Sequence, residues 1–234
     1  MTNILCILAS PRKNGYSARL LNPAIDAIKS FDSVNCELIH LYEYDIRPCA
    51  SCWSCLRDED HRCVLNDSMG GCGEGELFTK ILDANGVLIS QPVYYGRPPA
   101  ITHLFFERLY PFKWSGELSG MPFASISQAA NNGGARAANT EMARWASIFG
   151  LKYVGGLPVH LVQYDRALSR AKYLGRKIAE AAKTDSENRV RLMEIDRYLG
   201  STCNPWSSLE STISDITNRT FNYEDSLIAY ALNH

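Results

Sequence analysis

The chain has 234 residues, of which 46% are hydrophobic and 21% charged, and its formal net charge is −1. This length and composition are typical of a globular α/β protein, and the balance of 24 basic against 25 acidic residues leaves no basic stripe of the kind that binds nucleic acid. No apolar stretch reaches the length of a membrane span and the first residues lack the features of a signal peptide, so we expect a cytoplasmic protein without a membrane partner.

Short apolar runs alternate with amphipathic segments along most of the chain. The expected strands span 4–9, 36–41, 86–93, 123–127 and 153–161. The expected helices include 17–28, 76–82, 101–105, 138–149 and 168–181. Strands and helices that alternate in this way predict an α/β fold with a doubly wound, five-stranded parallel sheet.

Particular residues mark the ends of these elements. Ser17 is the expected N-cap of the first helix, and Pro23 inside that helix predicts a kink or a shifted start. Gly150 is the expected C-cap of the helix before the last strand. Gly155 and Pro158 indicate that the last strand lies at an edge of the sheet, since neither residue suits a central strand.

A polar loop, Ser10-Pro11-Arg12-Lys13-Asn14-Gly15-Tyr16-Ser17, joins the first strand to the first helix. The hydroxyls of Ser10 and Ser17, the Arg12 side chain and free backbone N–H groups can converge there on one phosphate, at the positive end of the helix. The glycines of a Walker A or dinucleotide loop are missing, which favours a mononucleotide phosphate over a pyrophosphate. A Ser/Asn-rich turn with no ligand is the alternative.

Three loops resemble those of the NADPH-dependent FMN reductases, a flavodoxin-like family. Ser-Pro-Arg-x-x-Gly-x-Ser is similar to the family's FMN phosphate loop, and Pro92-Val93-Tyr94-Tyr95-Gly96 is similar to the loop that packs on the flavin ring. Asn131-Asn132-Gly133-Gly134 fills the place of a third loop near the ring. Where the family often has Lys-x-Phe-x-Asp-Arg, this chain has His103-Leu104-Phe105-Phe106-Glu107-Arg108, so the Lys and Asp positions differ.

The resemblance spans about residues 3–183 and implies the strand order 2-1-3-4-5. In such sheets the ligand lies at the switch point between strands one and three, which are the two strands that the best-matching loops follow. The resemblance implies FMN contacts from Ser10, Arg12, Asn14, Tyr16, Ser17, Pro92, Val93, Tyr94, Tyr95, Gly96, Asn131, Asn132, Gly133 and Gly134.

Four of the eight cysteines crowd into one stretch, as Cys49-x-x-Cys52-x-x-Cys55, followed after seven further residues by Cys63. Two successive C-x-x-C steps supply three thiolates of a cubane cluster, whereas structural zinc more often uses two separated pairs. An iron–sulfur cluster, a zinc ion and metal-free thiols all remain open. Outside this stretch we expect Cys6 to be a small buried apolar residue.

The same spacing resembles the compact motif of the iron–sulfur flavoproteins, a branch of this FMN family. Asn66-Asp67-Ser68-Met69 is similar to that branch's Asp-Asp-Met, with Ser68 as a departure, and residues 70–75 look like an insertion that carries Cys72. The branch implies a [4Fe–4S] cluster on the same rim of the sheet as FMN, with Cys72 as an alternative fourth ligand. The implied ligands are Cys49, Cys52, Cys55 and Cys63.

These features predict an oxidoreductase in which reduced nicotinamide, NADH or NADPH, gives hydride to FMN and electrons pass onward to an unidentified small-molecule or protein acceptor. A dehydrogenase or quinone reductase without a cluster is one alternative, and a non-enzymatic carrier like flavodoxin is another. No acid–base residue is assigned. We expect surface or packing roles for Arg97 and His103, and a contact of either residue with substrate is the alternative.

Two parts are expected along the chain: an FMN-binding domain over 1–183, with a cysteine-rich insertion at 47–75, and an extension over 184–234. A helix is expected near 190–199. FMN sites in this family are often completed by a neighbouring subunit, so the extension is expected to serve in oligomerisation or as a lid, in a homodimer or homotetramer.

Overall fold

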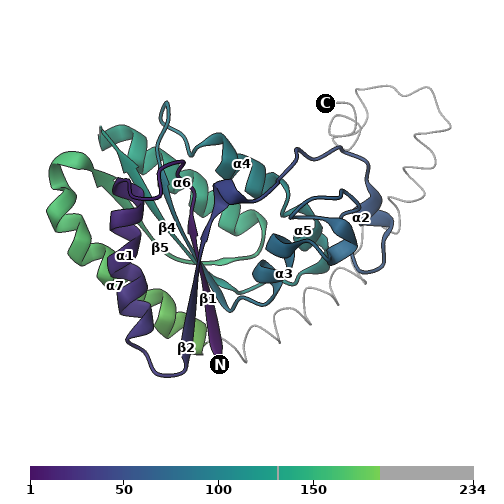
Figure 1. Cartoon of the computed structure of the whole chain (residues 1–234), viewed down its shortest axis with the longest axis horizontal. Helices are drawn as coiled ribbons and strands as arrows, with labels where there is room; N and C mark the ends of the chain where they lie inside the picture. Colours follow the sequence, from purple (N-terminus) through teal and green to yellow (C-terminus); the bar gives the residue numbers. More distant parts are fainter. Residues whose placement is uncertain (131, 185–234) are drawn as a thin grey trace. The chain divides into compact units, whose positions relative to one another are not determined.

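The computed structural model describes residues 1–130 and 132–184. Five parallel strands form one sheet in the order β2-β1-β3-β4-β5 (Figure 1). The strands are β1 Thr2–Leu8, β2 Val34–His40, β3 Gly86–Pro92, β4 Pro122–Ala129 and β5 Lys152–His160. The predicted flavodoxin-like fold and strand order are therefore confirmed.

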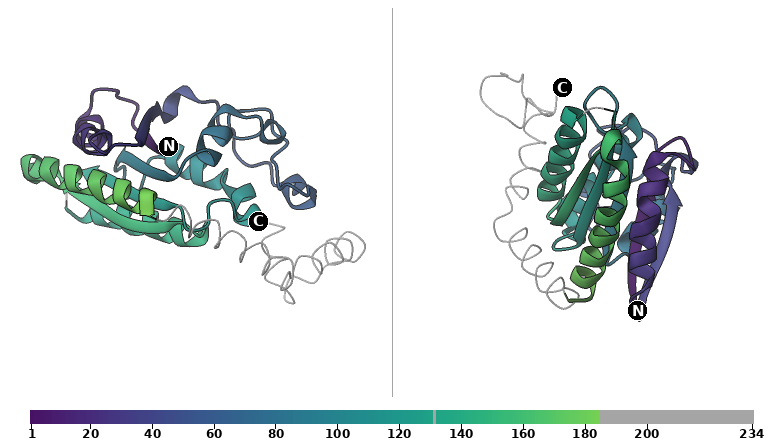
Figure 2. Two further views of the ribbon diagram at one scale, coloured as in Figure 1. Left: turned by 90° about the horizontal axis from the view of Figure 1, so that it is seen from below. Right: turned by 90° about the vertical axis from the view of Figure 1, so that its left-hand side faces the viewer.

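Helices cover both faces of this sheet. They are α1 Tyr16–Lys29, α2 Ser54–Arg57, α3 Glu76–Leu82, α4 Ala100–Glu107, α5 Tyr110–Ser115, α6 Asn132–Ile148 and α7 Tyr164–Thr184. α1 and α7 lie side by side on one face (Figure 2), and α3 to α6 pack on the other. Right-handed crossovers between parallel strands produce this two-sided arrangement. No helix in the described ranges is long and apolar enough to cross a membrane.

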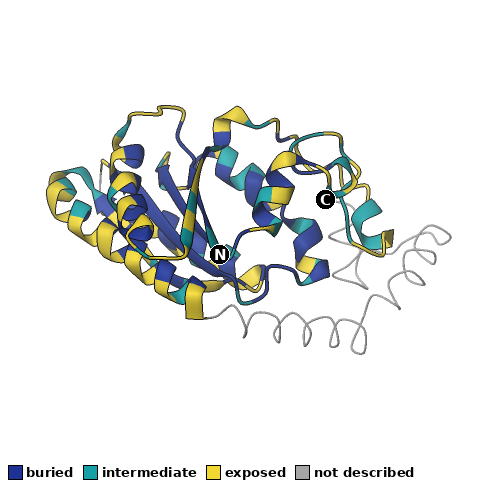
Figure 3. Ribbon diagram, turned by 60° about the horizontal axis from the view of Figure 1, so that its bottom comes forward, coloured by how far each residue is buried: buried dark blue, intermediate teal, exposed yellow. Residues whose placement is uncertain are grey.

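The core has two layers because side chains alternate along each strand. In β1, Leu5 and Ile7 face the α3–α6 side, whereas Ile4, Cys6 and Leu8 face α1 and α7. Every residue of β3 is buried, as expected for a central strand of a parallel sheet, and its apolar run over residues 87–89 is followed by the buried polar residues Ser90 and Gln91. The buried sheet and the exposed outer surfaces of the helices are seen in Figure 3.

The register brings the carboxyl ends of three strands level with one another. Leu8 pairs with His40 of β2 on one side and with Ser90 of β3 on the other. Pro92 at the end of β3 pairs in turn with Gln128 of β4. The loops that follow these strands therefore leave the sheet at the same edge.

Several predicted boundaries are confirmed and others need correction. Gly150 follows α6 with φ 68°, and the Leu151 N–H returns to the Ala146 carbonyl at 2.8 Å. β5 is an edge strand, as predicted. Ser17 is not the N-cap: the first helical bond runs from the Arg19 N–H to the carbonyl of Gly15, so α1 begins at Tyr16.

Other details were not anticipated. α1 runs through Pro23 without a break and its start is not shifted. β2 begins two residues before the predicted strand, and the short helices α2 and α5 were not predicted. The helix expected near 190–199 and nearly all of the 184–234 extension lie outside the described residues.

Candidate functional site

The phosphate loop spans the end of β1 and the start of α1. Ser10 is 3% exposed and its hydroxyl oxygen accepts the Arg12 N–H at 3.3 Å, while the Gly15 N–H donates to the Arg12 carbonyl at 3.2 Å. These bonds close a tight turn that leaves the Arg12 and Asn14 side chains exposed. Ser17 is buried, and its carbonyl accepts the Ser90 hydroxyl at 2.8 Å.

The donor set of this loop fits a phosphate. No side chain caps α1, whose N-cap is Gly15, so the N–H groups of its first turn are available to an anion. The exposed Arg12 guanidinium adds a positive charge, and the Ser10 hydroxyl, which donates to the Arg12 carbonyl at 3.4 Å, lies on the same turn. Tyr16, at the same helix end, is 42% exposed and packs edge-on against Tyr164 at 5.2 Å between ring centroids.

The second loop follows β3 as a tight two-residue turn. Tyr94 and Arg97 exchange backbone hydrogen bonds of 2.9 and 3.0 Å across it. The two central residues, Tyr95 and Gly96, have φ values of 52° and 79°, the left-handed pair that such a turn requires. The Tyr95 ring is fully exposed and Tyr94 is 44% exposed, so this turn presents aromatic rings to solvent beside the phosphate loop. Pro92 is buried and Val93 is half-buried below the turn.

The third predicted loop is largely helical. β4 ends at Ala129 and α6 begins at Asn132, so Asn132, Gly133 and Gly134 form the first turn of α6. Asn131 lies outside the described residues. The segment therefore brings a helix N-terminus, with its backbone N–H groups, to the carboxyl edge of the sheet.

Contacts that the sequence did not suggest hold the phosphate loop from the side of β2. The ring of His40 is hydrogen-bonded through Nε2 to the Ser10 carbonyl, and Lys13 forms an ion pair with Glu43. Because Leu8 and His40 are register partners, the sheet itself places this histidine beside the loop. Only the parallel pairing of β1 with β2 could have revealed these contacts.

Arg97 and His103 both meet Glu141 on α6. Arg97 Nη1 lies 2.9 Å from one carboxylate oxygen and His103 Nε2 lies 3.7 Å from the other. The His103 ring also packs edge-on against Trp145 at 4.7 Å. These contacts agree with the packing and surface roles expected for both residues.

The cysteine-rich stretch at residues 47–75, called the cysteine segment below, lies beside α4 and α5. Cys49 and Cys52 are exposed, and Cys55 and Cys63 are half-buried. Burial and the neighbouring charges of Cys63, Cys49 and Cys52 raise the pKa of Cys55 to about 11. Each of the other three thiols therefore lies within electrostatic range of Cys55. Yet no three His, Cys, Asp or Glu side chains among residues 1–130 and 132–184 come close enough to hold a metal ion.

Two arginine–carboxylate pairs join the carboxyl-terminal half of this segment to residues that follow α4 and α5. Arg62 binds Glu117 through two hydrogen bonds of 2.8 Å. Arg108 forks onto Asp67, and both side chains are almost completely buried, with exposed fractions of 1% and 0%. Burial would raise the pKa of Asp67, but hydrogen bonds from Arg108 and from the N–H groups of Arg47 and Met69 hold it below its ordinary value.

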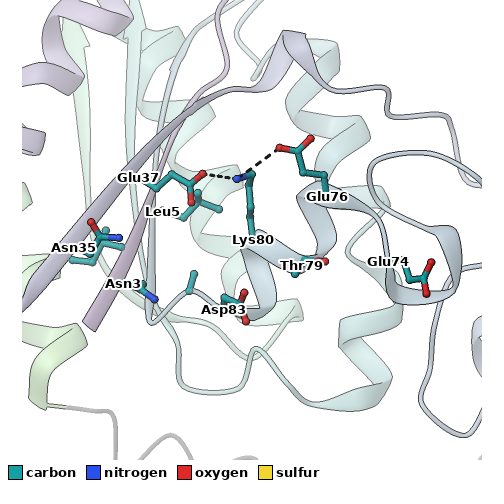
Figure 4. A pocket seen from close by; sticks show the side chains of 11 residues that line it. Asn3, Leu5, Asn35, Glu37, Glu74, Glu76, Thr79, Lys80 and Asp83 are labelled. Carbon is teal, nitrogen blue, oxygen red and sulfur yellow. Dashed lines mark hydrogen bonds and ion pairs between the residues drawn. The ribbon is translucent and has the colours of Figure 1, made fainter. Parts of the chain in front are cut away.

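A separate cavity of about 520 Å³ lies between β1, β2 and α3 (Figure 4). Lys80 reaches across it to Glu37 at 2.5 Å and to Glu76 at 3.7 Å. Asn3 and Asn35 place this cavity near the amino ends of the strands, away from the three loops. It is not part of the candidate flavin site.

Comparison with known sequences gives one family. The sequence profile of the family described as NADPH-dependent FMN reductase matches residues 2–166. An iron–sulfur flavoprotein of Archaeoglobus fulgidus is 30% identical over 197 residues, which cover 82% of this chain and 84% of that protein. An iron–sulfur flavoprotein of Methanocaldococcus jannaschii is 25% identical over 195 residues, covering 77% of this chain and 97% of that protein.

Comparison with solved structures supports the fold. A flavone reductase superposes with a TM-score of 0.58 at 19% sequence identity, covering 78% of this chain. The match spans only 63% of the flavone reductase, so that enzyme carries a substantial part without a counterpart here.

Proposed function

Because the chain belongs to the NADPH-dependent FMN reductase family, in its iron–sulfur flavoprotein branch, and is thus an oxidoreductase, we propose that it takes electrons from NADH or NADPH through FMN to a further acceptor. The observation that carries the proposal is the phosphate loop at the end of β1, with its uncapped helix and its serine and arginine donors. The chemistry belongs to FMN, which accepts a two-electron hydride and can release electrons singly.

The residues of the chain serve to bind and orient the cofactor. Ser10, Arg12 and the first turn of α1 hold the FMN phosphate, with Asn14, Tyr16 and Ser17 completing the loop around it. The turn that follows β3 and the start of α6 flank the isoalloxazine ring. The ring-side set is Pro92, Val93, Tyr94, Tyr95, Gly96, Asn132, Gly133 and Gly134. Asn131 belongs to the same proposal although it lies outside the described residues.

The cysteine segment is proposed to hold a [4Fe–4S] cluster on Cys49, Cys52, Cys55 and Cys63. Their spacing and the names of the relatives support this ligand set. In the described residues these four thiols do not come together as a metal site, so the ligand set rests on their spacing and on the names of the relatives. We derive no electron-transfer step through the cluster.

Two alternatives make different predictions for the pure protein. A dehydrogenase or quinone reductase would contain FMN, lack iron and oxidise NAD(P)H with a specific organic acceptor. A flavodoxin-like carrier would contain FMN and oxidise NAD(P)H very slowly. The length of 234 residues and the net charge of −1 count against a carrier, because flavodoxins tend to be smaller and strongly acidic.

One anaerobic preparation tests the proposal. The purified chain is assayed for FMN, iron, acid-labile sulfide and NAD(P)H oxidation. We expect bound FMN, iron and sulfide together with rapid oxidation. Protein with FMN but without iron, even after reconstitution, would remove the cluster and leave the flavin enzyme. Protein that neither holds nor accepts FMN would contradict the whole proposal.

A further inference from the structure

Two cysteines outside the cysteine segment meet across the sheet. The sulfur of Cys6 on β1 lies 3.4 Å from the sulfur of Cys36 on β2, although the two residues are 30 positions apart in the chain. Cys6 is completely buried, whereas Cys36 is half-buried on β2, which is an edge strand of the sheet. The pair therefore has one thiol inside the core and one that solvent reaches.

The strand pairing disfavours a disulfide between these two residues. The register partner of Cys36 is Ile4, so Cys6 lies two residues further along β1. With strands about 4.8 Å apart and a rise of about 3.3 Å per residue, such diagonal neighbours have Cα atoms about 8 Å apart. A disulfide needs Cα atoms within about 7 Å of each other. Because β1 is also paired with β3, the sheet holds the two sulfurs in contact without joining them.

The surroundings of Cys36 favour its ionised form. The hydrogen bond to Cys36 and complete burial raise the pKa of Cys6, so Cys6 keeps its proton and is the donor of the pair. The same hydrogen bond lowers the pKa of Cys36 against the effect of burial, and the charge of Lys29, in the last turn of α1, lowers it further. Cysteines that are partly exposed in an electropositive setting of this kind are the reactive ones.

We propose that Cys36 is a thiol-modification site, at which a low-molecular-weight disulfide forms a mixed disulfide while the buried Cys6 serves as a hydrogen-bond donor to the reacting sulfur. The Cys36 thiolate attacks one sulfur of the small disulfide, R–S–S–R. The new S–S bond forms as the original one breaks, and the departing R–S⁻ takes up a proton from water. The Cys36 sulfur is thereby oxidised and the departing sulfur is reduced. Neither FMN nor the proposed cluster takes part in this exchange.

The first test reads the mixed disulfide directly. The full chain is freed of reductant and incubated at pH 7 with hydroxyethyl disulfide, and each cysteine is then analysed separately by peptide mass spectrometry. We expect a mixed disulfide on Cys36 that dithiothreitol releases, with Cys6 still a free thiol. A disulfide between Cys6 and Cys36, or a Cys36 that stays unmodified, would overturn the proposal.

The second test separates an activated thiol from one that is only accessible. Cys6→Ala removes the hydrogen-bond donor, and Lys29→Gln removes the charge. Each should slow the alkylation of Cys36 by iodoacetamide at pH 7 about three- to tenfold and move the midpoint of its pH–rate profile upward, because the thiolate is the form that reacts. Cys6→Ser keeps a donor and should stay closer to the wild type than Cys6→Ala. Lys172→Gln, at an exposed lysine of α7, is the matched control and should leave Cys36 unchanged.

The melting temperature of each variant shows whether it has folded. Lys29 is exposed, so Lys29→Gln remains informative even if the space left by Cys6→Ala lowers stability. A pH–rate midpoint of Cys36 that is the same in Lys29→Gln, in folded Cys6→Ala and in the wild type would overturn the proposal. None of these variants alters a residue of the proposed FMN site or cluster, so failure here leaves those proposals standing.

Discussion

At the scale of single residues, the phosphate loop, residues 10–17, is held by contacts from the side of β2, and its Arg12 and Asn14 side chains are exposed to solvent. His40, the last residue of β2, is hydrogen-bonded to the Ser10 carbonyl, and Glu43, in the short turn that follows, forms an ion pair with the Lys13 ammonium. Arg12 is exposed on the same loop. Because the Lys13 ammonium is already paired with Glu43, the Arg12 guanidinium is the charge of this loop better placed to bind a phosphate.

Replacement of Arg12 by alanine should weaken FMN binding about tenfold, because a charge-assisted contact to phosphate is lost. Quenching of FMN fluorescence on titration with apoprotein measures the dissociation constant. Arg176→Ala, an exposed arginine on α7, is the control and should bind FMN like the wild type. An Arg12→Ala protein with unchanged affinity would remove Arg12 from the phosphate site.

The buried Asp67–Arg108 pair also makes stability depend on pH. The folded pKa of Asp67 lies below its unfolded value, so the pair stabilises the fold above the unfolded pKa, and this contribution is lost as the pH falls through the folded pKa. We expect the wild type to lose stability more steeply below about pH 4 than Arg108→Met/Asp67→Leu, in which no such carboxylate titrates. Urea unfolding of both proteins from pH 7 to pH 3 makes the comparison. If the free energy of unfolding falls with pH in parallel for the two proteins, Asp67 does not contribute to the pH dependence of stability.

At the scale of elements, the sequence is informative wherever the pattern is local. The apolar runs located all five strands, and the loops that follow β1 and β3 were recognised from their own residues. α2 and α5 are too short for a helical period to emerge. The Arg108–Asp67 contact joins residues 41 positions apart, and only the folded chain reveals it.

One glycine sets how closely two helices approach. A Cβ atom on Gly175 of α7 would lie 2.3 Å from the carbonyl oxygen of Ala24 on α1. Gly175→Ala should therefore push the helices apart and lower the free energy of unfolding by about 1–3 kcal/mol. Gly86→Ala is the control, because its new Cβ would meet its nearest neighbours at an ordinary 3.5 Å. Equal urea midpoints for Gly175→Ala and the wild type would show that the helices accommodate the methyl group.

At the scale of the whole molecule, we predict that the chain self-associates. The extension beyond Thr184 contains Trp206 and Phe221, apolar residues for which a five-stranded core has no evident need. Light scattering should give a mass that is a multiple of 26.1 kDa. Truncation after Thr184 should lower the number of subunits in the particle or change the accessibility of the flavin. A monomer at working concentrations would contradict this prediction.

The central claim is that the carboxyl edge of the sheet holds an FMN that reduced nicotinamide can reach. The register levels the ends of β1, β2 and β3, and the loops of that edge carry the donors that we propose for the phosphate and the aromatic rings that we propose for the flavin. Stepwise anaerobic addition of NADH or NADPH to the FMN-loaded protein, followed by its visible spectrum, tests the claim most directly. We predict that the oxidised flavin band bleaches with one of the two nucleotides and returns when an acceptor is added. A bound FMN that stays oxidised in excess NADH and NADPH would contradict the account.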